Sequence, residues 1–321
     1  MKYCFMINPA SGKKATKEGL EDRILSACRE RGIQPTIIIS KSGDDARQQV
    51  MDFCNANVGE ELRVYACGGD GTLNIVMNAI MSAEDHSKVS LGVIPVGTGN
   101  DYVRNFKPTE SFMDIGAQLD AREAVIDLTK INDLYSINIV NTGFDAYAVC
   151  NMERVKKNKF VSSKFAYILG VAMTLIKKPG VKVTVTSEDG KEVHHDLMLI
   201  TFANGRYYGG GFNSNPNAHL NDGTMNVLFV NNLSRLKFVL LVKHYKNGTH
   251  LCGKFHKILR EEIATSCELK FDAPTPISID GEIKFIDHAK ISTAKGALKF
   301  LIPSGVSDIP ALVKENETVN A

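Results

Sequence analysis

Long uninterrupted apolar runs are missing from this chain. The nearest candidates, residues 165–176 and 238–242, are shorter than the roughly 18 residues that a membrane-spanning helix needs. The apolar start at residues 1–7 ends at Asn8-Pro9, too early for a secretory signal. We therefore expect neither a membrane span nor a cleaved leader.

A surplus of one charge is also missing. Lys and Arg together number 38, Asp and Glu together number 36, and the formal net charge is +2. A balance this close to neutral predicts no nucleic-acid partner. Any anionic partner must then be met by a local patch of basic residues.

The cysteines and histidines show no spacing typical of a disulfide framework or a zinc site. The seven cysteines include no CxxC pair and their number is odd, while the eight histidines have no ligand spacing. We expect reduced thiols in a cytosolic protein.

The first part of the chain alternates short apolar strands with helical stretches. Strands are expected over 3–7, 36–39, 63–67 and 91–94, and helices over 16–30, 44–54 and 72–81. This order is typical of a largely parallel sheet that is covered by helices.

Strand-like alternation dominates after that. We expect strands over 124–130, 136–140, 181–186, 193–202, 225–230, 267–271, 276–279, 289–292 and 297–301, with helices over 162–178 and 234–245. Glu188-Asp189-Gly190 is a typical hairpin turn. The sequence predicts an α/β domain over 1–127, a β-rich sandwich domain over 128–303, and a polar tail over 304–321 that can pack back on the first domain.

Small and polar residues follow three of the expected strands, at 8–12 (Asn-Pro-Ala-Ser-Gly), 68–74 (Gly-Gly-Asp-Gly-Thr-Leu-Asn) and 95–101 (Pro-Val-Gly-Thr-Gly-Asn-Asp). In α/β sheets, ligands bind at the carboxyl ends of strands. Glycines let the backbone approach a phosphate, and exposed amides at a helix start favour anions. One such loop is as often a tight turn, but three at adjacent strand ends predict a phosphate-binding site.

The same loops exclude two familiar nucleotide sites. Gly12-Lys13 lacks the earlier glycine of a P-loop, and Lys14 stands where that motif has Ser or Thr. Gly97-Thr98-Gly99 is followed by residues 100–102 without the third glycine of a dinucleotide fingerprint.

Together the three loops resemble the diacylglycerol kinase catalytic-domain family, which includes bacterial lipid kinases and the sphingosine and ceramide kinases. The resemblance continues in order at 141–146 (Asn-Thr-Gly-Phe-Asp-Ala), 209–212 (Gly-Gly-Gly-Phe), 221–223 (Asn-Asp-Gly) and 280–282 (Asp-Gly-Glu). The Gly-Gly-Asp-Gly-Thr run alone is less specific, because NAD kinases and phosphofructokinase relatives share it.

The resemblance implies a phosphofructokinase- and NAD-kinase-like α/β domain and a β-rich sandwich, with ATP in the cleft between them. It implies transfer of the γ-phosphate of ATP, with Mg²⁺, to the hydroxyl of diacylglycerol or a related lipid alcohol. The implied nucleotide-binding residues are Asn8, Ser11, Gly12, Ser40, Gly69, Asp70, Gly71, Thr72, Asn74 and Thr98.

The resemblance also assigns roles to carboxylates. Glu282 matches the general base, which accepts the proton of the lipid hydroxyl as its oxygen attacks the γ-phosphate, and Asp70 is the second choice for this role. Phosphoryl transfer requires amide donors, magnesium and an oriented carboxylate. Without the resemblance, Asp280-Gly281-Glu282 is more simply a hairpin turn.

Two kinds of magnesium site are implied. Asp222 matches a structural ligand, with backbone oxygens near His219 and Thr224 completing the shell, although Asn221-Asp222-Gly223 alone is more often a plain turn. Asp70 or Asp101 would hold a catalytic ion through waters, because Mg²⁺ prefers oxygen ligands and retains waters.

The chain departs from the family pattern at two positions. Ile75 stands where the family commonly has Glu, and Asn221 replaces a frequent Asp. Ile75 puts in doubt either one magnesium contact or an interaction at the helix start, and Asn221 puts in doubt the strength of the structural site. Two alternatives stay open: an NAD kinase, and a nucleotide sensor that binds ATP without transferring phosphate.

A lipid acceptor implies transient contact with a membrane surface, so we expect a cytoplasmic enzyme of phospholipid biosynthesis, peripheral to the inner face of the membrane. Basic residues flank the apolar stretch 165–176, and Lys237, Lys243 and Lys246 lie on a later expected helix. Such helices can rest on an anionic bilayer; core helices with solvated charged ends are the alternative. Tyr207-Tyr208 can line the acceptor pocket or form a packed corner. The lipid species and a possible homodimer are left open.

Overall fold

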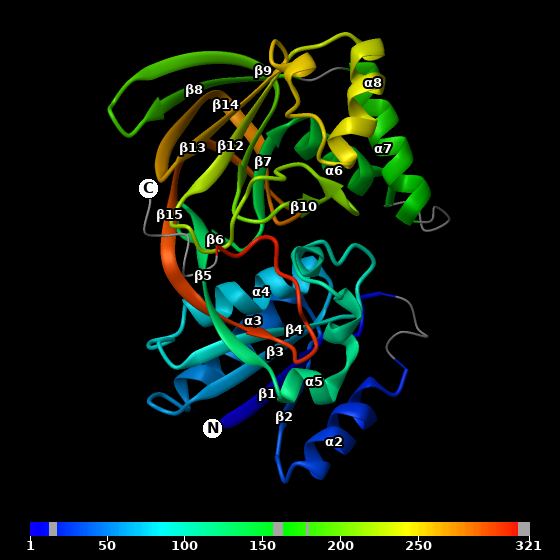
Figure 1. The fold of residues 1–321 in the computed structure, drawn as a ribbon, viewed down its shortest axis with the longest axis vertical. Coiled ribbons are helices and arrows are strands. Elements are labelled where there is room, and N and C mark those ends of the chain that lie inside the picture. Colours follow the sequence, from blue (N-terminus) through cyan, green and yellow to red (C-terminus); the bar gives the residue numbers. More distant parts are fainter. Residues whose placement is uncertain (13–17, 157–162, 178–179, 314–321) are drawn as a thin grey trace.

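The structure is a computed structural model that describes residues 1–12, 18–156, 163–177 and 180–313. The molecule has two halves stacked along its longest axis (Figure 1). The early strands and helices form one half, and most of the later strands form the other. Among the described helices, none is long and apolar enough to cross a membrane.

The first half is a parallel sheet in the order β2-β1-β3-β4. Its strands are β1 (Lys2–Ile7), β2 (Thr36–Ile39), β3 (Leu62–Gly68) and β4 (Val89–Pro95). Its helices are α2 (Leu20–Glu30), α3 (Gly43–Asn55), α4 (Asp70–Met81) and α5 (Ile115–Leu119), with short 3₁₀ turns at Tyr102–Asn105 and Thr109–Met113. This is the α/β fold that the alternation of strands and helices predicts.

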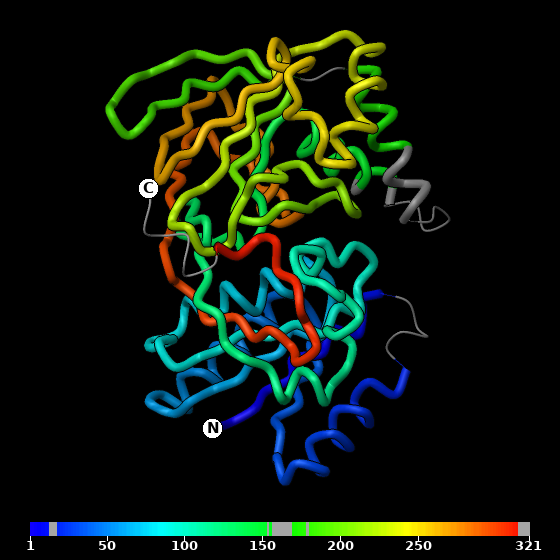
Figure 2. Tube along the Cα trace, viewed as in Figure 1, coloured from blue at the N-terminus to red at the C-terminus, as the bar shows by residue number. Residues whose placement is uncertain are grey.

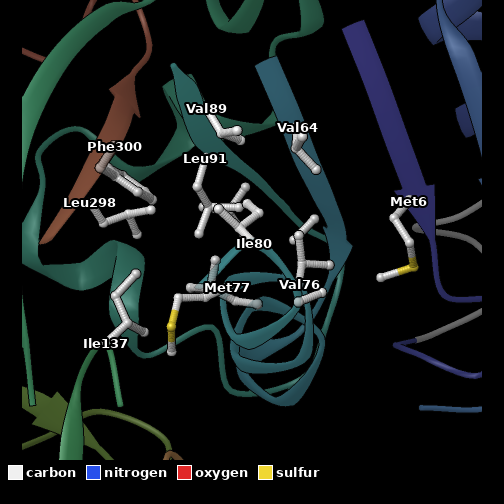
Figure 3. Packing of buried hydrophobic residues seen from close by; sticks show 14 of the residues in the cluster. Met6, Val64, Val76, Met77, Ile80, Val89, Leu91, Ile137, Leu298 and Phe300 are labelled. Carbon is white, nitrogen blue, oxygen red and sulfur yellow. The ribbon is translucent and has the colours of Figure 1, made fainter. Parts of the chain in front are cut away.

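Alternation along β1 explains why helices cover both faces of this sheet. Cys4 and Met6 point into one core with α3 and α4, while Phe5 and Ile7 point into another with α2 and α5. In Figure 3, side chains of α4 point toward those of β3 and β4, and Leu298 and Phe300 lie beside Leu91. Successive strand residues face opposite sides, so both faces of the sheet carry apolar side chains.

The second half is rich in antiparallel strands. They are β5 (Arg122–Ile131), β6 (Leu134–Ser136), β7 (Ile139–Gly143), β8 (Val181–Ser187), β9 (Glu192–Ala203), β10 (Tyr207–Tyr208), β11 (Phe212–Asn213), β12 (Met225–Asn231), β13 (Leu259–Ala264), β14 (Ser266–Ile279) and β15 (Glu282–Ile302). Its helices are α6 (Phe144–Lys156), α7 (Ser163–Lys177) and α8 (Arg235–Lys246), with a 3₁₀ turn at Gly253–Phe255. The β8–β9 hairpin lies where the Glu188-Asp189-Gly190 turn predicts it. The β-rich sandwich is confirmed.

The long strands β5 and β15 join the two halves. In the described residues, β15 pairs with β14 and β5 in antiparallel fashion and also with β4 in parallel, through Lys299 and Phe300. One continuous sheet therefore runs through both halves, in the order β13-β12-β9-β7-β14-β15-β4-β3-β1-β2. The domain boundary expected after residue 127 falls inside β5 and stays a prediction.

Some elements differ from the sequence-based expectation. Residues 267–279 and 289–301 were each expected as pairs of short strands, but β14 and β15 are single strands with irregular register near Lys270 and Ala294. Bulges let a strand continue where the residue pattern breaks. Helix α6 follows directly on Gly143, where no helix was expected.

The segment after β15 runs between the halves (red in Figure 2). The amide of Ser304 donates to the carbonyl of Ala117, and the amide of Lys107 donates to the carbonyl of Asp308 at 2.8 Å. Further along, the carbonyl of Ala311 accepts from the amide of Leu220 at 2.7 Å. Residues 304–311 thus contact both halves; 314–321 lie outside the described residues.

Candidate active site

The three glycine-containing loops meet at the carboxyl ends of β1, β3 and β4. A Cβ on Gly97 would lie 2.3 Å from the Cα of Gly69, and a Cβ on Gly12 would lie 1.7 Å from the carbonyl oxygen of Val96. Only glycine permits such close backbone approach. The glycines therefore hold the three loops together as one surface.

Polar side chains link the same loops. The amide of the Asn8 side chain donates to Thr72 Oγ1 at 2.9 Å, and Asn8 Oδ1 accepts from the amide of Ala10. Ser11 Oγ lies 3.6 Å from the position that a Cβ on Gly69 would take, and Thr98 is exposed between two glycines. The structure brings Asn8, Ser11, Gly12, Gly69, Asp70, Gly71, Thr72 and Thr98 together.

The amino end of α4 points at this surface. Gly69 is the N-cap residue, and among the described residues no side chain caps it. The first amides of a helix lack partners within the helix and carry a partial positive charge. This helix start is therefore suited to a phosphate group.

The remaining two predicted nucleotide residues lie at the margin of the loops. Ser40 is buried at the end of β2, and its hydroxyl and amide both donate to the carbonyl of Ile7. Asn74 is also buried, and its side-chain amide donates to Asp280 and to the carbonyl of Tyr135. The Asn74 side chain therefore joins α4 to the second half of the molecule.

Ile75 does not face the loops. It packs against the core around α4, and a Cβ on Gly43 would lie 3.2 Å from its Cδ1. Ile75, which stands where the family commonly has Glu, therefore fills space beside the start of α3.

Two carboxylates flank Gly99. A Cβ on this glycine would lie 3.0 Å from Asp70 Oδ2 and 3.5 Å from Asp101 Oδ2. Burial, and then the nearby charge of Asp70, raises the pKa of Asp101 above its ordinary value. A divalent cation between two oxygen donors relieves such like-charge repulsion. These residues fit the expected catalytic Mg²⁺.

Each of the two carboxylates is held by donors. Asp70 Oδ1 accepts from the amide of Tyr102 at 3.0 Å. Asp101 Oδ1 accepts from Arg104 Nε at 3.2 Å, and Asp101 Oδ2 accepts from the amide of Gly210 at 2.8 Å. Because Gly210 belongs to the second half, Asp101 fixes the two halves relative to each other at the site.

Asp280 organises the turn that carries the predicted base. It accepts hydrogen bonds from the side chains of Asn74 and Ser136 and from three successive amides, 137–139, at 2.6–3.1 Å. Burial raises the pKa of Asp280, and these donors oppose the rise. The sequence pattern identified Asp280 only as part of the Asp-Gly-Glu motif, and its role as an acceptor for distant segments was missed.

The turn itself explains the Asp-Gly sequence. Asp280 has φ 49° and Gly281 has φ 94°, and the two residues connect β14 to β15 in a tight hairpin. Two-residue hairpin turns with positive φ at both positions favour Asp-Gly. Glu282 follows the turn as an exposed side chain, and its Oε1 lies 3.3 Å from the position of a Cβ on Gly71. The structure thus brings Glu282 to the first turn of α4.

A cavity of about 460 Å³ adjoins these carboxylates. Asp70, Asp101 and Gly281 contribute to its wall, and the rest is mostly apolar. The apolar lining comes from α6, α8 and the strands between them and includes Phe144, Ala148, Met198, Leu199, Val230 and Phe238. The cavity can take an apolar molecule with a polar end at the carboxylates.

Asp145, Tyr208 and Tyr245 also line this cavity. The Tyr208 hydroxyl donates to Asp145 Oδ2 and lies 3.2 Å from the Tyr245 hydroxyl. Burial raises the pKa of Asp145 to about 7. Of the Tyr207-Tyr208 pair, Tyr208 lines the cavity, while the carbonyl of Tyr207 accepts from the side-chain amide of Asn138.

The turn with the predicted structural metal ligand is held by protein groups. Asp222 Oδ1 accepts from the amide and the hydroxyl of Thr224 at 2.9 and 2.8 Å. Asp127 accepts from the amide of Gly223 at 2.6 Å, and a Cβ on Gly223 would lie 3.2 Å from Lys295 Nζ. Lys295 thus brings a positive charge to this turn.

Among the described residues, no group of three or more His, Cys, Asp and Glu side chains is arranged to hold a metal ion. The donors near Asp222 therefore do not form a side-chain cage. The metal site at His219, Asp222 and Thr224 stays a prediction that rests on backbone oxygens.

Sequence models of two domain families match the chain. The diacylglycerol kinase catalytic domain matches residues 2–131, and the YegS C-terminal NAD kinase beta sandwich-like domain matches residues 138–302. The second match alone spans more than half of the chain, and the boundary between the matches lies within a few residues of β6.

Individual relatives agree with these matches. The chain is 26% identical over 317 residues to a protein of Shewanella frigidimarina named "Probable lipid kinase YegS-like", covering 96% of each chain. It is also 26% identical to a diacylglycerol kinase of Mycobacterium tuberculosis, covering 94% of this chain and 95% of the relative. A crystal structure of a diacylglycerol kinase from Bacillus anthracis has the same fold, with a TM-score of 0.69 at 19% identity and coverage of 95% and 98%.

The two domain matches, their order along the chain and the shared fold lead to one conclusion: this chain belongs to the diacylglycerol kinase catalytic-domain family and is a kinase.

Proposed function

We propose that this enzyme transfers the γ-phosphate of ATP to the hydroxyl of a lipid alcohol, diacylglycerol or a related lipid. The observation that carries the proposal is the apolar cavity whose wall includes Asp70, Asp101 and Gly281. A lipid can place its chains in such a cavity and its hydroxyl beside the carboxylates. The glycine loops next to the same carboxylates are suited to the phosphates of ATP.

In the proposed reaction the oxygen of the lipid hydroxyl forms a bond to the γ-phosphorus. The bond from that phosphorus to the oxygen bridging the β-phosphate breaks, and ADP leaves with the electron pair. The hydroxyl proton passes to the carboxylate of Glu282, which reaches the first turn of α4. Asp70 is the second candidate for this proton.

Positioning carries most of the catalysis of phosphoryl transfer, together with neutralisation of charge. Asp70 and Asp101 are the groups that would hold Mg²⁺, which would offset the negative charge of the phosphates. Asp280 would orient Glu282 by fixing the hairpin turn before it. Arg104 would keep Asp101 in place, since it donates to both Asp101 and the carbonyl of Gly99.

The apolar lining favours a lipid over NAD as the acceptor. An NAD molecule carries a pyrophosphate and two riboses, for which Phe144, Leu199 and Phe238 offer no hydrogen-bond partner. The placement of Ile75 beside α3 weakens the case for a non-catalytic sensor, because this substitution takes no group away from the loops. A cytoplasmic enzyme of phospholipid biosynthesis, acting at the inner face of the membrane, follows as part of the proposal.

The deciding experiment measures ADP release and phosphorylated product from ATP and Mg²⁺. A panel of lipid alcohols in mixed micelles would serve as acceptors, with NAD as the control acceptor. We expect a phosphorylated lipid and no NADP. NADP formation would support the NAD kinase instead, and ATP binding without any product would support the sensor.

A further inference from the structure

Helix α8 (Arg235–Lys246) turns large apolar side chains toward solvent. Leu236 is 72% exposed, Val239 60% and Leu240 62%. Their spacing of three and four positions places them on one face of the helix. Burying these apolar side chains against a partner would be favourable in free energy, so their exposure to water points to a surface that is covered in use.

The end of α7 (Ser163–Lys177) extends this stripe. Arg235 donates from Nη2 to the carbonyl of Ile176 at 2.8 Å and from Nε to that of Leu175 at 3.2 Å. Ile176, at 69% exposure, is thereby held next to the start of α8. Figure 1 shows both helices at the same edge of the second half. We name Ile176, Leu236, Val239 and Leu240 the α8 patch.

The α8 patch lies on a helix that carries positive charge. Residues 223–260 contain seven Lys and Arg and no Asp or Glu, whereas the whole chain has a net charge of only +2. Lys237, Lys243 and Lys246 are all exposed on α8 itself. Basic side chains therefore alternate with the exposed apolar side chains along α8. The other basic run, at 154–164, lies partly outside the described residues.

The α8 patch is continuous with the acceptor cavity. Phe238, Leu241 and Val242 of α8 line the cavity, and Val239 both lines it and is exposed. One helix thus forms a wall of the cavity with one side and an apolar surface with the other. A lipid could move from that surface into the cavity along Val239.

We propose that the α8 patch and the lysines of α8 dock the protein on an anionic lipid bilayer, with Leu236 and Leu240 entering the interfacial region. This assignment rests on the proposed function, since a lipid kinase must reach acceptors within a bilayer. Apolar side chains beside lysines on one helix match the acyl boundary and the anionic headgroups of such a surface. A second copy of the chain fits less well, because a symmetric contact would bring two positively charged segments together.

The first test is sedimentation with vesicles in the absence of ATP. The protein should bind vesicles of phosphatidylglycerol and phosphatidylcholine and should bind pure phosphatidylcholine at least tenfold more weakly. The Leu236→Ser/Leu240→Ser variant should lose at least tenfold in affinity. Ile263→Ser is the matched control, because Ile263 is 69% exposed on β13 and is not part of the α8 patch, and this variant should bind normally.

A second variant tests the charges. Lys237→Glu/Lys243→Glu should weaken binding by at least twentyfold, since each basic residue near an anionic surface contributes about fivefold. Raising the salt concentration should also weaken the binding of the wild-type protein to anionic vesicles, because salt screens the attraction between the lysines and the headgroups. Normal vesicle binding by both double variants would overturn the assignment.

Two further readouts distinguish bilayer docking from a catalytic defect and from self-association. Turnover on a short-chain acceptor dissolved as monomers should be unchanged in both double variants, because none of the four residues lines the cavity. Sedimentation velocity should show the same oligomeric state for all forms; a dimer lost in Leu236→Ser/Leu240→Ser with vesicle binding intact would show self-association instead. Vesicle binding without phosphorylation of any lipid would refute the proposed function and leave the docking surface standing.

Discussion

The Asn74 side chain donates a 2.8 Å hydrogen bond to the Asp280 carboxylate, although 206 positions separate the two residues. Asn74 lies on the helix that starts at the glycine loops, and Asp280 lies in the turn before the proposed base. This contact is therefore one of those that hold the expected phosphate site and Glu282 at a fixed distance.

Replacing Asp280 should destabilise the protein. Asp280→Ala would leave three amides at 137–139 without their acceptor and would remove one of the two acceptors of Asn74, and each buried unsatisfied donor costs about 1–3 kcal/mol. We expect a loss of at least about 3 kcal/mol in urea unfolding. Asp272→Ala, at an exposed position, is the control and should change stability little. Equal stability of the two variants would contradict the role assigned to Asp280.

Replacing Glu282 should remove turnover and spare ATP binding. Glu282→Gln keeps the size of the side chain but cannot accept the proton, and a lost general base typically costs about 10²–10⁴-fold in rate. ATP affinity, measured by titration calorimetry, should change less than threefold. Glu192→Gln, another exposed glutamate, is the control. A Glu282→Gln enzyme with normal kcat would shift the base assignment to Asp70.

Closing the gap between two loops should weaken nucleotide binding. In Gly97→Ala the new Cβ would lie 2.3 Å from Gly69 Cα, so one of the two loops must move. We expect ATP affinity to fall at least tenfold, with a smaller effect on the melting temperature. Gly253→Ala is the matched control, because a Cβ there meets nothing within 4 Å. Unchanged ATP affinity in Gly97→Ala would place the nucleotide elsewhere.

The acid in the cavity should make stability depend on pH. Burial raises the pKa of Asp145 from 3.8 to about 7, so between these values the unfolded chain loses a proton that the folded protein keeps. Stability from this group is therefore fully present below about pH 4 and is lost as pH rises to 7, by at most about 4 kcal/mol. Urea unfolding from pH 5 to 8 should show this slope in the wild type and a smaller one in Asp145→Asn. Identical slopes would mean that Asp145 titrates normally.

A chelator experiment tests the structural metal. Asp222→Ala removes the acceptor for the amide and hydroxyl of Thr224 and should cost about 1–2 kcal/mol even without a metal. If magnesium also binds there, EDTA should lower the melting temperature of the wild type and leave that of Asp222→Ala unchanged. If EDTA changes the melting temperature of neither the wild type nor Asp222→Ala, no magnesium ion stabilises this turn, and Lys295 is its source of positive charge.

Local patterns in the sequence predicted much of the site. The glycines of the three loops could be recognised in the sequence as points where the backbone approaches a ligand or another loop. The expected order of strands and helices then predicted that the three loops lie at the same edge of the sheet. The same reasoning placed Asp70 and Thr72 at the loops, whereas the resemblance to the family singled out Glu282. The roles of all three residues stay predictions.

Contacts between distant segments could not be predicted in this way. Asp280 accepts from residues 74 and 136–139, and nothing in its immediate sequence distinguishes it from an ordinary Asp-Gly turn. Helix α6 was missed because its start coincides with the family motif at 141–146. The continuity of β15 was missed because Gly296 and the surrounding polar residues interrupt its alternation.

The position of β15 has a consequence for biosynthesis. Its residues 299–300 cover the outer edge of β4, yet they are made long after β4 itself. While the ribosome is still synthesising the second half, the nascent α/β half carries an open strand edge, which is a site for wrong pairing. The finished sheet thus has to wait for β15, the last of the described strands, and the edge of β4 stays open to wrong pairing during that interval.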